Sequence, residues 1–212
     1  MHCRCLQIAF FPRRLYFRRI HLRCSGEEKF TMSDAPPWRF SHVGLFVKDL
    51  DNMAEFYKQV FSMVETDGGE ARGNNVKFLS RDSTEHHQLV LETSRKSEET
   101  TVQQLSFRFS SLDDLRQMKS RIEGLSRNIL SKAMAPYGVN HGIAWSLYCH
   151  DPEGNRIELF IDSPFYVCQP CVNPLDLSMT DDEILQETKN KFGDEPTFKP
   201  WSEWSRELED RL

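Results

Sequence analysis

Apolar and polar residues follow the same order twice along residues 40–162. Alternating apolar positions in the first copy predict strands, and a helical spacing of apolar residues between them predicts one helix. The predicted elements of this copy are, in order, a strand, a helix and two further strands, over residues 42–47, 52–61, 76–79 and 88–91. Gly68, Gly69 and Gly73 mark turns between the helix and the next strand.

The second copy repeats this order over residues 104–161. It predicts a strand, a helix entrance, a helix and three strands, over residues 104–109, 110–114, 115–125, 129–133, 143–148 and 156–161. The second copy thus reads as a β-α-β-β-β module, and we interpret each half as a module of this kind. The expected fold class is α+β, with two modules forming a cupped mixed sheet that has one helix-covered face and one open face.

Strand parity predicts which side chains lie on the open face, because successive side chains of a strand point to opposite sides. His42 lies opposite the apolar Val43, Leu45 and Val47, and Gln104 lies opposite Leu105, Phe107 and Phe109. Glu158 likewise lies opposite the apolar Ile157, Leu159 and Ile161. The last strand of the first half adds one of His86, Gln88 or Glu92. Open faces that close on one another would gather the side chains of a metal site.

The two ends of the chain differ from its body. Residues 1–37 form a basic extension with six arginines and no acid in its first 26 residues, which indicates a mitochondrial presequence or a segment upstream of a start at Met32. Residues 165–212 form an acidic tail, in which Thr180 caps a predicted helix over 179–191. Phe198, Trp201 and Trp204 then predict an extended strap over the domain or a partner subunit. The domain itself is expected over residues 38–164.

Composition narrows the classes of protein. The 212 residues carry a net charge of -5 and a mean hydropathy of -0.57, which argue against nucleic acid and membrane as partners. The six cysteines do not form a disulfide framework, so we expect a reducing compartment, cytoplasmic or mitochondrial. Cys168 and Cys171 are interpreted as two loop thiols and not as a zinc site, because no second pair accompanies them.

Two motifs resemble a known family. The opening His42-Val-Gly-Leu-Phe-Val-Lys-Asp-Leu50 and the closing Asp151-Pro-Glu-Gly-Asn-Arg-Ile-Glu-Leu-Phe160 are similar to those of the vicinal oxygen chelate superfamily of glyoxalase I, bleomycin-resistance proteins and extradiol dioxygenases. Residues 139–158 resemble the extradiol ring-cleavage motif. The tail resembles that of small 2,3-dihydroxybiphenyl dioxygenase-like proteins, and the resemblance covers residues 40–185.

This resemblance implies a metal-dependent dioxygenase that cleaves a small catecholic aromatic beside its hydroxyl groups. Fe(II) or Mn(II) would be held by His42, Gln104 and Glu158, with His141 as acid/base and Tyr148 as a hydrogen-bond donor to the substrate. The family has a second imidazole where this chain has Gln104. Three explanations stay open: Gln104 ligates the metal anyway, a nearby histidine such as His86 substitutes for it, or the site no longer performs extradiol chemistry.

Two alternatives to ring cleavage stay open. A ligand set completed by Glu92 would resemble glyoxalase I, with Zn or Ni and an isomerase or lyase reaction. The same cup could also be a non-catalytic module that binds a small aromatic ligand. The sequence leaves a homo-oligomer open.

Overall fold

The computed structural model describes residues 39–100, 102–125 and 135–211. The basic extension over residues 1–37 and the strand expected near 129–133 lie outside the described residues. None of the described helices is long and apolar enough to cross a membrane.

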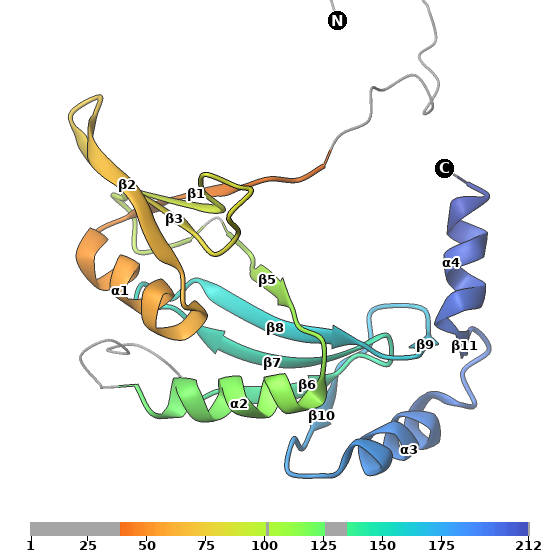
Figure 1. Ribbon diagram of the computed structural model, residues 1–212. Coiled ribbons are helices and arrows are strands. Elements are labelled where there is room, and N and C mark those ends of the chain that lie inside the picture. The colour runs from red at the N-terminus through yellow and green to blue at the C-terminus, as the bar shows by residue number, and fades with distance from the viewer. Residues whose placement is uncertain (1–38, 101, 126–134, 212) are drawn as a thin grey trace, which may run out of the picture. The chain divides into compact units, whose positions relative to one another are not determined.

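The first module is a four-stranded mixed sheet with one helix packed on it (Figure 1). Its elements are β1 (Val43–Val47), α1 (Leu50–Phe61), β2 (Val64–Ala71), β3 (Asn74–Ser80) and β4 (Leu89–Thr93). The strand order is β1-β4-β3-β2, with β1 parallel to β4 and the other pairs antiparallel. The Asp49 side chain accepts a hydrogen bond from the Asn52 backbone and so caps α1.

The second module repeats this architecture. Its elements are β5 (Leu105–Arg108), α2 (Leu112–Glu123), β6 (Tyr137–Asn140), β7 (Ala144–His150) and β8 (Arg156–Asp162). With β10 (Asn173–Leu175) they give a five-stranded sheet of order β10-β6-β7-β8-β5, in which β5 is parallel to β8. The expected α+β class and the repeated β-α-β-β-β pattern are therefore confirmed.

The turn between β7 and β8 of the second module makes hydrogen bonds with the first module. Asp151 is buried there and accepts a hydrogen bond from the Tyr57 hydroxyl of α1, at 3.2 Å. Glu153 accepts hydrogen bonds from the Lys48 and Asp49 backbone amides that precede α1, at 2.6 and 2.9 Å. The regular Asp-Pro-Glu-Gly-Asn sequence of this turn thus holds the first module against the second.

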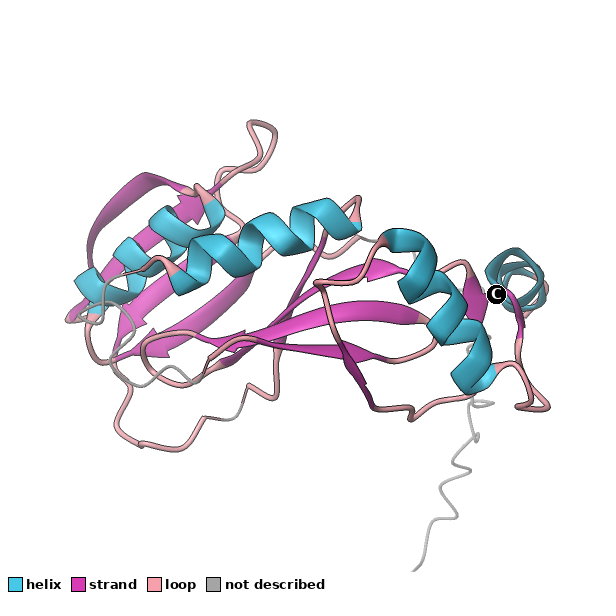
Figure 2. Ribbon diagram, turned by 90° about the horizontal axis from the view of Figure 1, so that it is seen from below, coloured by secondary structure: helices cyan, strands magenta, loops and turns pink. Residues whose placement is uncertain are grey.

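The tail packs on the second module and then turns outward. It contains β9 (Phe165–Tyr166), α3 (Asp181–Phe192), β11 (Lys199–Pro200) and α4 (Trp201–Glu209). Thr180 caps α3 as predicted, and Thr188 of that helix bonds the Asn140 and Trp145 side chains at 2.8 and 2.9 Å. The expectation of an extended strap is corrected at residues 201–209, which form a helix whose Trp204 stacks on Tyr166. Figure 2 shows α1, α2 and α3 along the sheets from the side of the helices.

Candidate functional site

The register of the second sheet brings a set of polar and aromatic side chains together on the face away from α2. Parity and pairing place them in three adjacent rows across the strands. We call this set the Glu158 face. Its rows are His150 with Arg156, Tyr137 with Tyr148, Glu158 and Ser106, and Ser146 with Phe160 and Arg108. Gln104, one residue before β5, joins the first row through its hydrogen bond with Arg156. The Glu158 face contains two of the three predicted metal ligands and one of the two predicted catalytic residues.

The Glu158 carboxylate is the centre of this face and accepts four hydrogen bonds. Oε1 accepts from the Ser146 hydroxyl at 2.9 Å and from the Tyr148 hydroxyl at 2.7 Å. Oε2 accepts from the Ser106 hydroxyl at 2.6 Å and from Gln104 Nε2 at 2.9 Å. Glu158 is 9% exposed, so these hydrogen bonds replace most of the hydration that an ionised carboxylate requires.

Gln104 is fixed from both ends of its amide. Its nitrogen donates to Glu158, and its oxygen accepts a hydrogen bond from the Arg156 guanidinium at 3.1 Å. The Arg156 guanidinium also lies 5.3 Å from the centre of the Tyr148 ring. The amide oxygen, which is the atom of glutamine that binds metals, therefore already faces a cation.

His141 joins the Glu158 face through Tyr148. The distance from His141 Nε2 to the Tyr148 hydroxyl is 3.0 Å, and His141 Nδ1 lies 2.6 Å from the carbonyl oxygen of Cys171. A carbonyl only accepts, so Nδ1 carries a proton. Burial and the hydrogen bond to Glu158 raise the pKa of Tyr148 well above its usual value, so its hydroxyl also keeps its proton.

These contacts form a chain for proton transfer. Tyr148 has one hydroxyl proton and donates it to Glu158, so the contact with His141 is a hydrogen bond when Nε2 also carries a proton. In the alternative arrangement Tyr148 donates to His141 and a protonated Glu158 donates to Tyr148. A proton can therefore move between His141 and Glu158 without ionising the tyrosine.

His42 belongs to a different cluster, in the first module. Its ring centre lies 4.4 Å from that of His87, and His87 Nδ1 lies 2.9 Å from Nδ1 of His86. His86 in turn contacts Asp67 at 3.3 Å. Within the described part of the chain, no hydrogen bond or ring contact links His42 to Gln104 or Glu158.

The predicted ligands do not fit a metal ion in this arrangement. No group of three or more His, Cys, Asp or Glu side chains among the described residues is arranged to hold a metal. The Glu158 oxygens are taken by four donors, and Gln104 presents its amide nitrogen to Glu158 and its oxygen to Arg156. The ligand roles of His42, Gln104 and Glu158 stay predictions, and we derive no reaction step through a metal.

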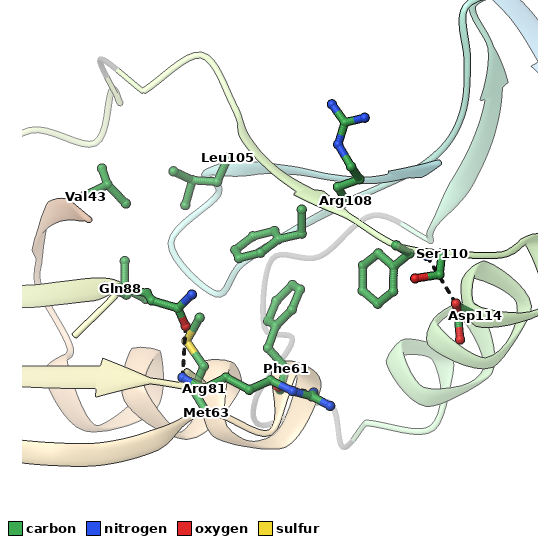
Figure 3. Close-up of a pocket in the computed structure, with 12 residues that line it drawn as sticks. Val43, Phe61, Met63, Arg81, Gln88, Leu105, Arg108, Ser110 and Asp114 are labelled. Carbon is green, nitrogen blue, oxygen red and sulfur yellow. Dashed lines mark hydrogen bonds between the residues drawn. The ribbon is translucent and has the colours of Figure 1, made fainter. Parts of the chain in front are cut away.

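A cavity of about 490 Å³ lies between the modules on the opposite side of β5 (Figure 3). Phe61, Leu105 and Phe107 form its apolar wall, and Leu105 and Phe107 alternate along β5 with Gln104 and Ser106 of the Glu158 face. Figure 3 shows Gln88 and Arg81 on one side of it, and Ser110 and Asp114 on another. The cavity thus lies on the other side of β5 from Glu158, and Arg108 of the Glu158 face also belongs to its lining.

Sequence reasoning missed further participants in the Glu158 face as functional residues, among them Ser106, Ser146, Arg156 and Tyr137. Parity alone places Ser146 and Arg156 on the face of Glu158, but their contacts depend on the pairing of β7, β8 and β5. Tyr137 lies on β6, a strand that the sequence did not predict.

The chain belongs to the Glyoxalase/Bleomycin resistance protein/Dioxygenase superfamily, whose model matches residues 39–159. A glyoxalase/bleomycin resistance protein/dioxygenase domain from Frankia sp. EAN1pec has the same fold, with 19% identity over 60% of this chain and 100% of that one, at a TM-score of 0.50.

Two other solved structures are similar to parts of the chain. The fosfomycin resistance protein FosX from Listeria monocytogenes, solved with Mn(II) and sulfate, has 19% identity, covering 58% of this chain and 91% of its own, at a TM-score of 0.43. A protein described as a possible glyoxalase from Bacillus cereus has 19% identity, with coverage of 58% and 98% and a TM-score of 0.44. No curated protein matches the sequence.

Proposed function

We propose that this protein binds a small aromatic molecule with acidic oxygens, such as a phenol or catechol, on the Glu158 face without a metal ion there. The observation that carries this proposal is the closed set of hydrogen bonds around Glu158 and Gln104. A carboxylate that accepts four hydrogen bonds organises its neighbours and has little capacity left for a metal.

The surroundings of Glu158 favour an aromatic ligand with a partial negative charge. Tyr137 stacks on Tyr148 and is 40% exposed, and Arg108 lies 4.8 Å from the centre of the Phe160 ring. Aromatic side chains supply planar contact, and the Arg156 guanidinium favours an acidic oxygen, whereas Arg108 is paired with Asp162. Ser106 is exposed, and its hydroxyl oxygen can accept a hydrogen bond from a hydroxyl group of the ligand while it donates to Glu158.

Calorimetric titration of chelator-treated protein with catechol, phenol and benzene-1,3-diol tests this function. We expect saturable binding of at least one of these probes, and a loss of about tenfold in affinity in Tyr137→Leu, because an aromatic stacking partner is removed. The matched control is Tyr166→Leu, which removes a tyrosine of the tail that stacks on Trp204. Equal weakening by both substitutions would place the ligand elsewhere, and no binding of any probe would exclude the proposal.

Ring cleavage of a catechol is the second candidate. It is favoured by the contacts that connect His141, Tyr148 and Glu158, since the resemblance assigns catalysis or ligation to all three. It would require Fe(II) or Mn(II) at Glu158, and so a rotation of Gln104 away from Arg156.

Anaerobic metal analysis separates the candidates. Protein incubated with Fe(II), Mn(II), Zn(II) and Ni(II) is desalted and its metal content is measured, and oxygen uptake is then recorded with catechol. Retained iron or manganese with oxygen uptake supports ring cleavage, whereas retained zinc or nickel supports a glyoxalase-like isomerase or lyase. Catechol binding without retained metal supports the proposal, and Gln104→His should then bind no more iron than the wild type.

A further inference from the structure

The turn over residues 168–171, between β9 and β10, carries two free thiols. Cys168 is exposed and Cys171 is half-buried. Cys171 Sγ lies 3.3 Å from the carbonyl oxygen of Cys168, and Cys168 Sγ lies 3.7 Å from that of Gln169. Both sulfur atoms therefore lie against the same short turn, and Cys171 already folds back onto the residue with which it would pair.

The same turn fixes the position of His141. The Cys171 carbonyl accepts the Nδ1 proton of His141, and Gln169 Nε2 donates to the His141 carbonyl at 2.8 Å. Gln169 Oε1 also accepts from the Cys171 backbone amide at 3.0 Å, which ties the two contacts together. A change in the conformation of the turn will therefore change the hydrogen bonds that position the His141 imidazole.

We propose that Cys168 and Cys171 form a reversible disulfide that releases His141 and thereby weakens ligand binding at the Glu158 face. The effect on binding rests on the proposed function, whereas the disulfide and the release of His141 do not.

The oxidant required is a hydroperoxide. The Cys168 thiolate attacks one oxygen of the peroxide, the O–O bond breaks, and an alcohol or water leaves after protonation, so that Cys168 becomes a sulfenic acid. The Cys171 thiolate then attacks the Cys168 sulfur, the S–S bond forms and the hydroxyl leaves as water. Two thiols and one peroxide thus give a disulfide, an alcohol and water, and a dithiol reductant reverses the change.

Exposure decides the order of the two steps. Cys168 is the thiol that a peroxide reaches from solvent. Burial, together with Glu195 and Cys168, raises the pKa of Cys171 and lowers its thiolate fraction, so Cys171 resolves the sulfenic acid. Cys149 is a natural control, because burial and Asp151 raise the pKa of its thiol to about 12.

Disulfide geometry explains the effect on His141. An S–S bond is about 2.05 Å long and requires a defined dihedral angle, so Cys171 Sγ must leave the Cys168 carbonyl and rotate toward Cys168 Sγ. The carbonyl that holds His141 Nδ1 belongs to this same residue. Closing the S–S bond across this four-residue turn also pulls on the Cys171 backbone, so we expect its carbonyl to move away from His141 Nδ1 and the hydrogen bond that orients the imidazole toward Tyr148 to be lost.

The first test is chemical and independent of any ligand. Full-length protein is treated with hydrogen peroxide, unreacted thiols are blocked, and peptides are analysed by mass spectrometry. We expect the peptide with Cys168 and Cys171 to lose two hydrogen atoms, to regain them with dithiothreitol, and to be unchanged in Cys168→Ser, while Cys149 stays reduced. Absence of this disulfide in the wild type would overturn the proposal.

The second test follows His141 by NMR, with His141→Gln identifying its imidazole signals. Oxidation should shift the Nδ1 signals in the wild type and leave them unchanged in Cys171→Ser, which keeps the backbone carbonyl. Calorimetry with catechol should show an affinity about tenfold lower after oxidation, the size expected for one lost hydrogen bond. A disulfide without any shift at His141 would overturn the coupling. A shift in a protein whose reduced form binds no catechol would instead refute the proposed function alone.

Discussion

The two modules share a fold and a strand parity, but their open faces differ in how polar side chains are used. In the first module the polar groups form separate small sets: Glu92 with Arg72 and Asn74, and the histidine cluster that ends at Asp67. In the second module four donors converge on the single carboxylate of Glu158. A repeated backbone therefore does not imply a repeated site.

The difference follows from burial and from neighbours across the strands. Glu158 lies on β8, between β7 and β5, so it has neighbours on both sides. His42 precedes β1, an edge strand, and is exposed. Interior strands gather side chains from three strands at once, whereas edge positions leave theirs to solvent.

The largest expected effect concerns the turn that joins the modules. Asp151→Ala should lower the free energy of unfolding by roughly 3 kcal/mol, because it leaves buried donors on Tyr57 and Asn155 without an acceptor. Urea unfolding followed by circular dichroism measures this loss. Asp82→Ala, in an exposed turn, is the control and should change stability by less than about 0.5 kcal/mol. A loss below 1 kcal/mol for Asp151→Ala would mean that the turn does not hold the modules together.

Paired substitutions at Glu158 and His42 test the contrast between the two faces. Glu158→Ala should lower the free energy of unfolding by about 2 kcal/mol, because the Tyr148 and Ser146 hydroxyls lose a buried acceptor. His42→Ala should cost less than about 0.5 kcal/mol, since the ring is exposed. Equal losses in urea unfolding would contradict the distinction between an organised face and an open one.

The smallest expected effect is a pH dependence in the first module. Burial, followed by the charges of His42 and His86, lowers the pKa of His87, so the folded protein binds a proton there less readily than the unfolded chain. Stability from this group is present above the usual histidine pKa of about 6.5 and is lost as the pH falls from there to the lowered pKa.

His87→Gln should therefore show a weaker decline of unfolding free energy between about pH 7 and pH 5 than the wild type. Denaturant unfolding at several pH values measures it, with His150→Gln in the second module as control. A steeper decline in His87→Gln would give the opposite sign and refute the assignment.

The sequence predicted the two modules and the burial of most strand faces, because the apolar residues that alternate along a strand are the ones that pack into the core. Leu45 and Val47 are buried in β1 while Phe46 between them is exposed, as parity predicts. It did not predict β2, whose eight residues are all exposed and so carry no apolar alternation. The sequence also did not predict the helix α4. A proline at the start of a segment and two tryptophans within it are compatible with a helix and with an extended segment alike.

The site was predictable only to the level of single residues. Parity placed Gln104 and Glu158 on one face, and the structure brings them into contact. The expectation that His42 would join them needed the relative position of two sheets, which no local pattern encodes. Ser106 opposite Glu158 likewise depends on the register of β5 against β8, two strands that lie far apart in the chain.

The turn after β7 has a consequence for the order of events on the ribosome. The backbone amides before α1 donate to Glu153, which lies 105 residues beyond Lys48 along the chain. The Tyr57 hydroxyl donates to Asp151, which lies 94 residues beyond it. At roughly 5–20 residues per second, that stretch takes about 5–20 s to synthesise, so the nascent first module spends this time with the start of its helix incomplete. Its exposed β2, and the apolar residues that later pack against the second module, are then available to chaperones or to wrong partners until the hairpin of β7 and β8 emerges.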